Sequence, residues 1–321
     1  MIGAAFLSFC LAAAAAPAPA REVRVIMGTT AELQAGGLED PKPALDAGFA
    51  AFGLVDDTMS LWKPSELGRL NDSGGARVSE DLYRVLEAAV SVARASGGAF
   101  DPTVEPLVRA AGGMGGERRR LSSAERRALL ARVGHERIRL DPEGRRVTLD
   151  GARVDLGGIA KGYAVDLALA ALRKAGATQG LADLGGSSVG VFGLPLDMAA
   201  RDPETEDGAP WARFLLSEGA LSTSGGDQKP DHILDPRTGL PAREGVLSAT
   251  VVARSAVEAD ALSTAVYVLG VPRGLALLVE RGAAGFVLRR DRGRRTVWAT
   301  EGFADAYRLE LAPGVRLREG E

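Results

Sequence analysis

One stretch near the middle of the chain constrains its fold more than any other, and its sequence is Val154-Asp155-Leu156-Gly157-Gly158-Ile159-Ala160-Lys161-Gly162-Tyr163-Ala164-Val165-Asp166. The pattern predicts a short strand from Arg153 to Leu156, a glycine pair, and a helix from about Ile159 to Ala175 that ends at Gly176. Glycines at a strand-to-helix turn let backbone N–H groups approach a ligand closely. Lys161 falls in the first helical turn, where a cation opposes the helix dipole unless an anion lies nearby. The stretch is therefore either an anion site or a glycine-rich turn with a solvated lysine, and both interpretations stay open.

Composition, charge and the absence of known nucleotide-binding motifs narrow the class of protein to which this stretch can belong. The chain has 5 lysines among its 39 basic residues, so a lysine at position 161 is not a default of the composition. Neither the phosphate-binding loop G-x-x-x-x-G-K-[ST] nor the dinucleotide fingerprint G-x-G-x-x-G is present. The formal net charge of −3 argues against a nucleic-acid-binding protein. A length of 321 residues is enough for one large domain, and no linker or repeat divides the chain.

The first twenty residues differ from the rest of the chain. Residues 4–16 are apolar and rich in alanine, and Ala18-Pro19-Ala20 places small residues before Arg21, as at a signal-peptidase site. We therefore predict a secretory signal peptide over residues 1–20, a single domain over residues 21–321, and a periplasmic or extracytoplasmic location. Cys10 is the only cysteine and would leave with the signal, which excludes thiol and disulfide chemistry in the mature chain.

A polar stripe lies along the helix that we predict from Ala256 to Leu269. Because successive residues of a helix are rotated by about 100°, four polar side chains share one face: Asp260, Ser263, Thr264 and Tyr267. A carboxylate beside a hydroxyl suits a hard cation such as Mg²⁺, which binds few protein oxygens together with substrate phosphates. The alternative is a thin stripe that faces water. Ser255 and Glu258 predict a capping box where this helix begins.

Histidine is the side chain whose ordinary pKa lies near neutrality, and the chain has two. His232 precedes the turn from Asp235 to Gly239, where it could take a proton from a hydroxyl or simply bond to the backbone. His135 follows a glycine at a helix end, which favours a dipole or capping role outside the site. Trp62 and Phe100 are loop aromatics, which either stack on planar ligands or fill the edge of a core.

Eight short segments stand out along the chain: Met27-Gly28-Thr29-Thr30, Met59-Ser60 with Trp62 and Ser65-Glu66-Leu67, Gly98-Ala99-Phe100-Asp101, Asp155 to Tyr163, Gly185-Gly186, Thr223-Ser224-Gly225, His232 to Gly239, and Asp260 to Gly270. Each is a weak signal by itself. Their order, however, follows one pattern, and the chain resembles the ApbE family, the FAD:protein FMN transferases, from about Arg21 to near its C-terminus.

The resemblance implies a compact α+β protein related to the T-fold, with mixed or antiparallel sheets, flanking helices and a cleft that binds FAD. It implies an FAD site lined by eight residues: Met27, Trp62, Ala99, Phe100, Asp101, Asp155, Lys161 and Leu234. It also implies an Mg²⁺ site formed by the Gly158 carbonyl, Asp260, the Ser263 carbonyl and Thr264.

The reaction that the resemblance implies is Mg²⁺-dependent transfer of FMN from FAD to a threonine hydroxyl of an exported or membrane-bound redox flavoprotein, with release of AMP. His232 would take the proton from that hydroxyl. Two alternatives stay open: with water as the nucleophile the site would be an FAD pyrophosphatase, and a periplasmic protein that only binds FAD would be no enzyme. The chain departs from the family pattern in the short loop between Gly225 and His232, at Asp231 and at Ser187, which bears on acceptor recognition.

Overall fold

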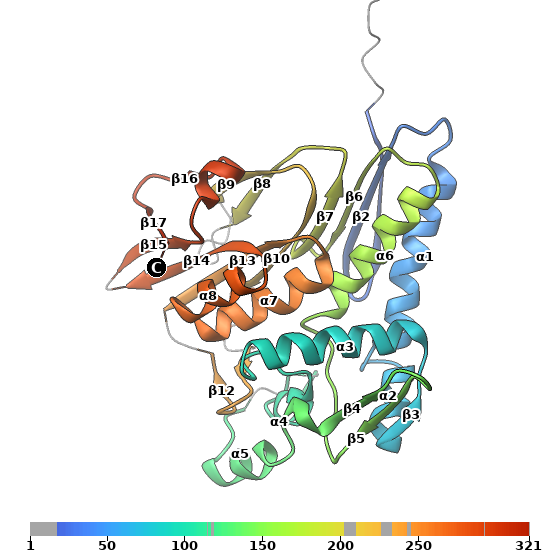
Figure 1. Cartoon of the computed structure of the whole chain (residues 1–321), viewed down its shortest axis with the longest axis vertical. Helices are drawn as coiled ribbons and strands as arrows, with labels where there is room; N and C mark the ends of the chain where they lie inside the picture. The colour runs from blue at the N-terminus through green and yellow to red at the C-terminus, as the bar shows by residue number, and fades with distance from the viewer. Residues whose placement is uncertain are drawn as a thin grey trace, which may run out of the picture.

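The computed structural model describes residues 18–113, 115–116, 119–201, 210–225, 233–242, 245–291 and 293–320. Figure 1 shows a large sheet with its helices in the upper part and a smaller group of helices and short strands below. The predicted signal peptide lies outside the described residues except for positions 18–20, and its predicted cleavage site follows Ala20, the first residue of β1.

A nine-stranded sheet crosses the upper part, and its neighbouring strands are antiparallel except for the last pair, β15 and β17. In spatial order the strands are β1 (Ala20–Ile26), β2 (Thr29–Gly36), β6 (Gln179–Leu184), β7 (Ser188–Phe192), β10 (Gly219–Gly225), β13 (Val246–Ala253), β14 (Ala284–Asp291), β15 (Arg294–Ala299) and β17 (Arg316–Glu319). Side chains alternate between the two faces of each strand, so this sheet has an apolar core on both sides. The predicted α+β class with mainly antiparallel sheets is confirmed.

Helices cover one face of the sheet (Figure 1). They are α1 (Lys42–Met59), α6 (Ala160–Lys174), α7 (Ala256–Leu269) and α8 (Arg273–Glu280), and α3 (Glu80–Ala95) packs on α7. The helix predicted after the glycine pair is α6, and Gly176 follows it with a φ of +93°, as a terminating glycine does. Phe52 and Leu262 are fully buried in the core between these helices and the sheet.

The other face of the sheet carries a second, smaller core. It lies under a three-stranded sheet of β8 (Leu196–Arg201), β9 (Pro210–Leu216) and β16 (Glu310–Leu311), together with α9 (Phe303–Tyr307). Phe286 of β14 is its centre, because the rings of Trp211, Phe214 and Phe303 lie edge-on to it at centroid distances of 5.4, 5.6 and 5.2 Å. This arrangement fixes β9 against the far half of the nine-stranded sheet.

The lower part holds the loops that lie beneath α3. It consists of α2 (Glu66–Ser73), a three-stranded sheet of β3 (Gly75–Arg77), β5 (Arg146–Leu149) and β4 (Ile138–Asp141), the 3-10 turns η1 (Pro102–Val104) and η2 (His135–Arg137), α4 (Glu105–Ala110), α5 (Ser123–Leu130), and the small hairpin of β11 (Leu234–Asp235) and β12 (Leu240–Pro241). A capping box begins α5, because the Ser122 hydroxyl accepts the Glu125 N–H and the Glu125 carboxylate accepts the Ser122 N–H.

The strand predicted from Arg153 to Leu156 is wrong, because this segment pairs with no strand of the described chain. Its backbone bonds elsewhere. The Asn71 side chain donates to the Val154 carbonyl at 2.8 Å and accepts the Val154 N–H at 2.7 Å, and the Asp155 N–H donates to the Pro102 carbonyl. A side-chain amide thus replaces a strand neighbour and holds the segment against α2.

The capping box predicted at the start of α7 is also wrong. Ser255 makes no side-chain capping bond, and Glu258 pairs with Arg281 instead, at 2.7 Å. The cap comes from α6, because the Asp166 carboxylate accepts the N–H groups of Ala256 and Val257 at 2.7 and 2.9 Å. Burial raises the pKa of Asp166 to about 6, although these two backbone bonds act in the opposite direction.

Candidate functional site

Two strand turns at one end of the nine-stranded sheet and the first turn of α6 contact one another, and two of the three hold a predicted FAD residue. The β1–β2 turn holds Met27, the β6–β7 turn holds Gly185-Gly186-Ser187, and the first turn of α6 holds Lys161. The Lys161 ammonium donates a hydrogen bond to the Ser187 hydroxyl, and a Cβ on Gly185 would lie 2.8 Å from Thr29 Oγ1. One ammonium group and the N-terminus of α6 therefore lie in the same place. This arrangement favours the interpretation of the glycine stretch as an anion site.

The β1–β2 turn itself has an unusual backbone. Met27 has a φ of +56° and Gly28 a φ of +70°. Two-residue hairpin turns with positive φ at both positions favour Asn-Gly, because most side chains are strained there. Such strain costs about 1 kcal/mol or more and concentrates at ligand sites. The backbone of Met27 is thus consistent with its predicted place in a binding site.

Asp260 on α7 faces the sheet and not the solvent. Its side chain is 4% exposed. Oδ2 accepts the Gly162 N–H at 2.9 Å, and Oδ1 accepts the hydroxyls of Ser222 at 3.0 Å and Ser188 at 3.3 Å. The alternative of a stripe that faces water is therefore wrong at this residue, because donors from α6, β7 and β10 surround the carboxylate.

The next turn of α7 extends this cluster of oxygens. Ser224 Oγ lies 2.9 Å from Ser263 Oγ and 3.2 Å from Thr264 Oγ1. A Cβ on Gly158 would lie 3.2 Å from Thr264 Oγ1, so the glycine turn before α6 touches the same helix face. The structure thus brings together all four predicted metal residues: Gly158, Asp260, Ser263 and Thr264.

These oxygens determine which cation could bind. In the part of the chain that the structure describes, no group of three or more His, Cys, Asp or Glu side chains could hold a metal ion. A cation here would have one carboxylate together with hydroxyl and carbonyl oxygens. Mg²⁺ accepts such a set, because it binds one or two carboxylates and takes its other ligands from water and substrate phosphates. The residues present therefore fit Mg²⁺ bound together with a phosphate-bearing substrate.

Asp155 adds a second carboxylate on the other side of the glycine pair. Its Oδ1 accepts the Gly157 N–H at 2.7 Å. Burial raises the pKa of Asp155 above its ordinary value; the Gly157 bond opposes this rise, and the charge of Glu105 adds to it. A carboxyl group in this position can accept a hydrogen bond from a ligand or, when protonated, donate one.

Asp101 was predicted to line the FAD site, and the structure shows its side chain bonded within the protein. Oδ1 accepts the N–H and the hydroxyl of Thr103, while Oδ2 accepts the His135 N–H at 2.8 Å and lies 3.1 Å from His135 Nδ1. His135, which the sequence places outside the site, borders a cavity of about 450 Å³ together with Asp101, Gly98 and Arg237. No local sequence signal points to this contact, because the two residues lie 34 positions apart.

The two loop aromatics have different surroundings. Trp62 is 70% exposed, so it does not fill a core edge, and its ring lies 3.0 Å from where a Cβ on Gly115 would be. Phe100 is buried against Gly158, and Ala99 is also buried. Leu234 is half-buried in the β11–β12 hairpin. Of these residues, Trp62 offers the open aromatic surface that stacking on a planar ligand requires.

The predicted base, His232, lies outside the described residues, as does Asp231. The described chain stops at Gly225, one residue after Ser224 of the oxygen cluster, and resumes at Ile233, one residue before Leu234. Both flanks therefore belong to segments that the sequence assigns to the site.

Known proteins resemble this chain over most of its length. The family model described as ApbE family matches residues 27–287. A protein named FAD:protein FMN transferase from Klebsiella pneumoniae (strain 342) is 28% identical over 326 residues, which cover 92% of this chain and 93% of that protein. One with the same name from Haemophilus influenzae (strain ATCC 51907 / DSM 11121 / KW20 / Rd) is 31% identical over 265 residues, 74% of this chain and 76% of that protein.

Solved structures agree with the sequence comparison. The flavin transferase ApbE from Vibrio cholerae superposes with a TM-score of 0.81 at 27% identity, covering 90% of this chain and 99% of that one. The apo form of the flavinyl transferase ApbE from Pseudomonas stutzeri gives a TM-score of 0.80 at 26% identity, covering 89% of this chain and 96% of that one.

Proposed function

The chain belongs to the ApbE family, and on that premise we propose that it is an FAD:protein FMN transferase. It transfers FMN from FAD to a threonine hydroxyl of an acceptor flavoprotein, depends on Mg²⁺ and releases AMP. The observation that carries this proposal is the buried carboxylate of Asp260, which is bonded to the N–H of the residue next to Lys161. The oxygen atoms that could bind a cation therefore contact the same turn of α6 that carries the Lys161 ammonium group, which could bind an anion. A metal-bound pyrophosphate needs both kinds of group.

Each part of the site has its own role. Lys161 and the glycine turn before α6 bind the pyrophosphate, because the ammonium group of Lys161 offers positive charge and the turn offers backbone N–H donors at a helix N-terminus. The Gly158 carbonyl, Asp260, the Ser263 carbonyl and Thr264 would hold Mg²⁺, which when bound neutralises charge on the phosphates. Trp62 stacks on the flavin or adenine ring with its exposed face.

The attacking group is the threonine hydroxyl of the acceptor. A hydroxyl is a poor nucleophile unless a positioned base takes its proton, and such a base contributes about 100- to 10,000-fold. We assign this role to His232, because its ordinary pKa lies near neutrality. The hydroxyl oxygen bonds to the FMN phosphorus, the pyrophosphate bond breaks, and AMP leaves with the bridging oxygen.

The partner is an exported or membrane-bound redox flavoprotein subunit, and the location is periplasmic or extracytoplasmic. The support for both is the predicted signal peptide together with the family. No helix within the described segments is long and apolar enough to cross a membrane.

The test is mass spectrometry of a flavoprotein subunit that carries covalent FMN in its native form, produced without this enzyme and then incubated with the protein, FAD and Mg²⁺. We expect one FMN on a threonine of the subunit and an equal amount of AMP. Asp260→Asn should abolish the product, whereas Asp150→Asn, an exposed carboxylate outside the site, should not. Free FMN and AMP without an adduct would show hydrolysis and overturn transfer, and unchanged FAD would indicate binding alone.

A further inference from the structure

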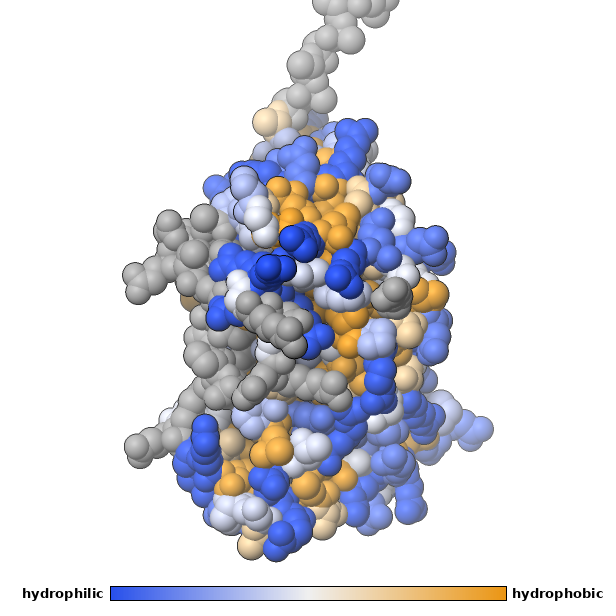
Figure 2. All heavy atoms as spheres, turned by 90° about the vertical axis from the view of Figure 1, so that its left-hand side faces the viewer, coloured by the Kyte–Doolittle hydropathy of each residue, from blue (hydrophilic) through white to orange (hydrophobic). Residues whose placement is uncertain are grey.

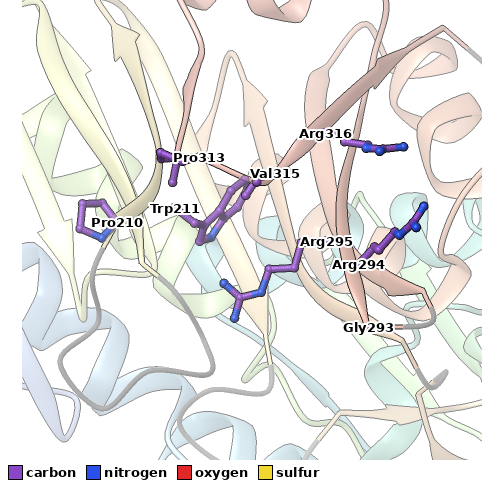
Figure 3. Close-up of a pocket in the computed structure, with 10 residues that line it drawn as sticks. Pro210, Trp211, Gly293, Arg294, Arg295, Pro313, Val315 and Arg316 are labelled. Atoms are coloured by element: carbon purple, nitrogen blue, oxygen red, sulfur yellow. The ribbon is translucent and has the colours of Figure 1, made fainter.

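A second cavity, of about 540 Å³, lies at the outer edge of the nine-stranded sheet, away from the Asp260 cluster. Pro210, Trp211 and Pro313 line one side of it, and Arg294, Arg295 and Arg316 come from β15 and β17 on the other (Figure 3). None of the ten lining residues in the described part of the chain is acidic, although the whole chain has a net charge of −3. The cavity is thus a local concentration of positive charge on an acidic protein.

Trp211 contributes a donor that lacks an acceptor. Its side chain is 2% exposed, and its indole N–H has no hydrogen-bond partner among the residues that the structure describes. A buried donor without an acceptor destabilises the fold, because it has lost its hydrogen bond to water and gained none in return. A group that entered the cavity with a free oxygen would restore that hydrogen bond. Together with the arginines, this favours an oxyanion, since guanidinium and indole groups both donate and neither accepts.

The arginines lie on both faces of the sheet edge. Figure 3 shows the Arg295 side chain extending toward the Trp211 side, while Arg294 and Arg316 extend to the opposite side. This follows from the alternation of side chains along β15. Neither Arg294 nor Arg316 forms an ion pair within the described ranges. A ligand that contacts Trp211 on one side and Arg294 and Arg316 on the other must therefore be longer than a single carboxylate.

The sheet edge itself supplies a template for such a ligand. β17 is the last strand in the order of the sheet, all four of its residues are exposed, and no strand of the described chain pairs with its outer edge. Figure 2 faces this side of the molecule and shows strongly hydrophilic side chains next to an exposed apolar area. An extended peptide can add to an open edge of this kind by backbone hydrogen bonds.

Strand register places this edge within reach of the candidate active site. Gly225 pairs with Ser248, Ser248 with Leu288, and Leu288 with Val297, two residues from Arg295. Three strand spacings of about 4.8 Å and two residues along β15 give roughly 15 Å between Gly225 and Arg295. About five extended residues cover that distance, so one acceptor molecule could occupy both places.

We propose that the edge formed by β15, β17 and Trp211 binds an extended acidic segment of the acceptor flavoprotein, with one carboxylate accepting the Trp211 indole N–H. This inference rests on the proposed function, because it names how the same enzyme holds its protein substrate. It assigns recognition to a surface separate from the residues that hold FAD.

The test is an NMR titration of the full mature chain labelled with ¹⁵N-tryptophan, which gives one indole N–H signal for each of its three tryptophans. The probe is a six-residue peptide of alternating Glu and Thr, and the control peptide has Gln in place of Glu. We expect a saturable shift of the Trp211 signal, assigned with Trp211→Phe, by the Glu peptide only. The double variant Arg294→Gln/Arg316→Gln should weaken binding about 3- to 10-fold, whereas Arg139→Gln, an exposed arginine on β4, should not.

Four results would overturn the proposal. The first two are the absence of a saturable shift and an equal shift with the Gln peptide. An equal shift with succinate at the same carboxylate concentration would mean a small-anion site. A shift seen only after four carboxylates are changed to amides would mean that carboxylates of the chain itself fill the cavity; these are Asp202, Glu204, Glu206 and Asp207. The titration needs no FAD, so its failure would leave FMN transfer untouched, and failure of transfer would leave the titration intact.

Discussion

Replacing Gly162 by alanine should push α6 and α7 apart where Asp260 is held. A Cβ at this position would lie 2.1 Å from the Ala256 carbonyl oxygen and 2.8 Å from the Asp260 Cβ. Ordinary contacts need about 3.5 Å, so one helix must move by about 1 Å. Overpacking of this kind costs about 1–3 kcal/mol, and weakening of the 2.9 Å bond from the Gly162 N–H to Asp260 adds to that cost. We expect the free energy of unfolding to fall by about 3 kcal/mol.

The same displacement moves the carboxylate that we assign to Mg²⁺, so the rate of FMN transfer at limiting Mg²⁺ should fall by at least about tenfold. Urea unfolding and an Mg²⁺ titration of the transfer rate measure the two effects on one preparation. Gly53→Ala is the matched control, because Gly53 lies in α1 and an added Cβ would have no described atom within 4 Å beyond its chain neighbours and the backbone of its own helix. It should raise stability by about 0.5–1 kcal/mol and leave transfer unchanged. A Gly162→Ala protein with wild-type stability and Mg²⁺ dependence would refute the close contact of the two helices.

Four further predictions concern single groups. Asp166→Asn should remove a pH dependence of stability, because burial raises the pKa of Asp166 from 3.8 to about 6 in the folded protein. The folded wild type therefore binds the proton more tightly than the unfolded chain, and this group adds about 1–3 kcal/mol to the free energy of unfolding as the pH falls from about 6 to 4. Urea unfolding at pH 4 and 7 should show no such gain in the variant. Asp260→Asn should keep the fold, because the amide can accept the Gly162 N–H and donate to the serine hydroxyls, but should lose Mg²⁺-dependent turnover; wild-type rates at limiting Mg²⁺ would contradict the metal assignment. His232→Ala should bind FAD normally by equilibrium titration and lose about 100- to 10,000-fold in transfer, whereas near-normal transfer would point to another base. N-terminal sequencing of protein expressed with its native start should begin at Arg21, and an intact Met1 on cytosolic protein would disprove export.

Local patterns were enough to predict several elements of this protein. The glycine pair, the helix after it and its terminating glycine follow from short-range rules, because backbone freedom and helix caps depend on neighbouring residues. The common face of Asp260, Ser263 and Thr264 follows from helical periodicity alone. The order of eight motifs indicated the family, which the comparisons confirm.

Only the tertiary structure decided which groups form hydrogen bonds with those elements. Whether the α7 stripe faces water or hydroxyls depends on the packing of β7 and β10, which are distant in the sequence. The cap of α7 is Asp166 and not Ser255, because α6 packs where it can supply a carboxylate to the helix start.

The segment before the glycine pair illustrates the same limit. Its alternating side chains predict a strand, yet Asn71, 83 positions away, takes the hydrogen bonds that a strand partner would have made. His135 reaches Asp101 across 34 positions in the same manner. The sequence by itself therefore determined the local conformations and the kinds of chemical group at the site. The tertiary structure decided their partners, because hydrogen bonds and burial depend on residues that are close in space and far apart in the chain.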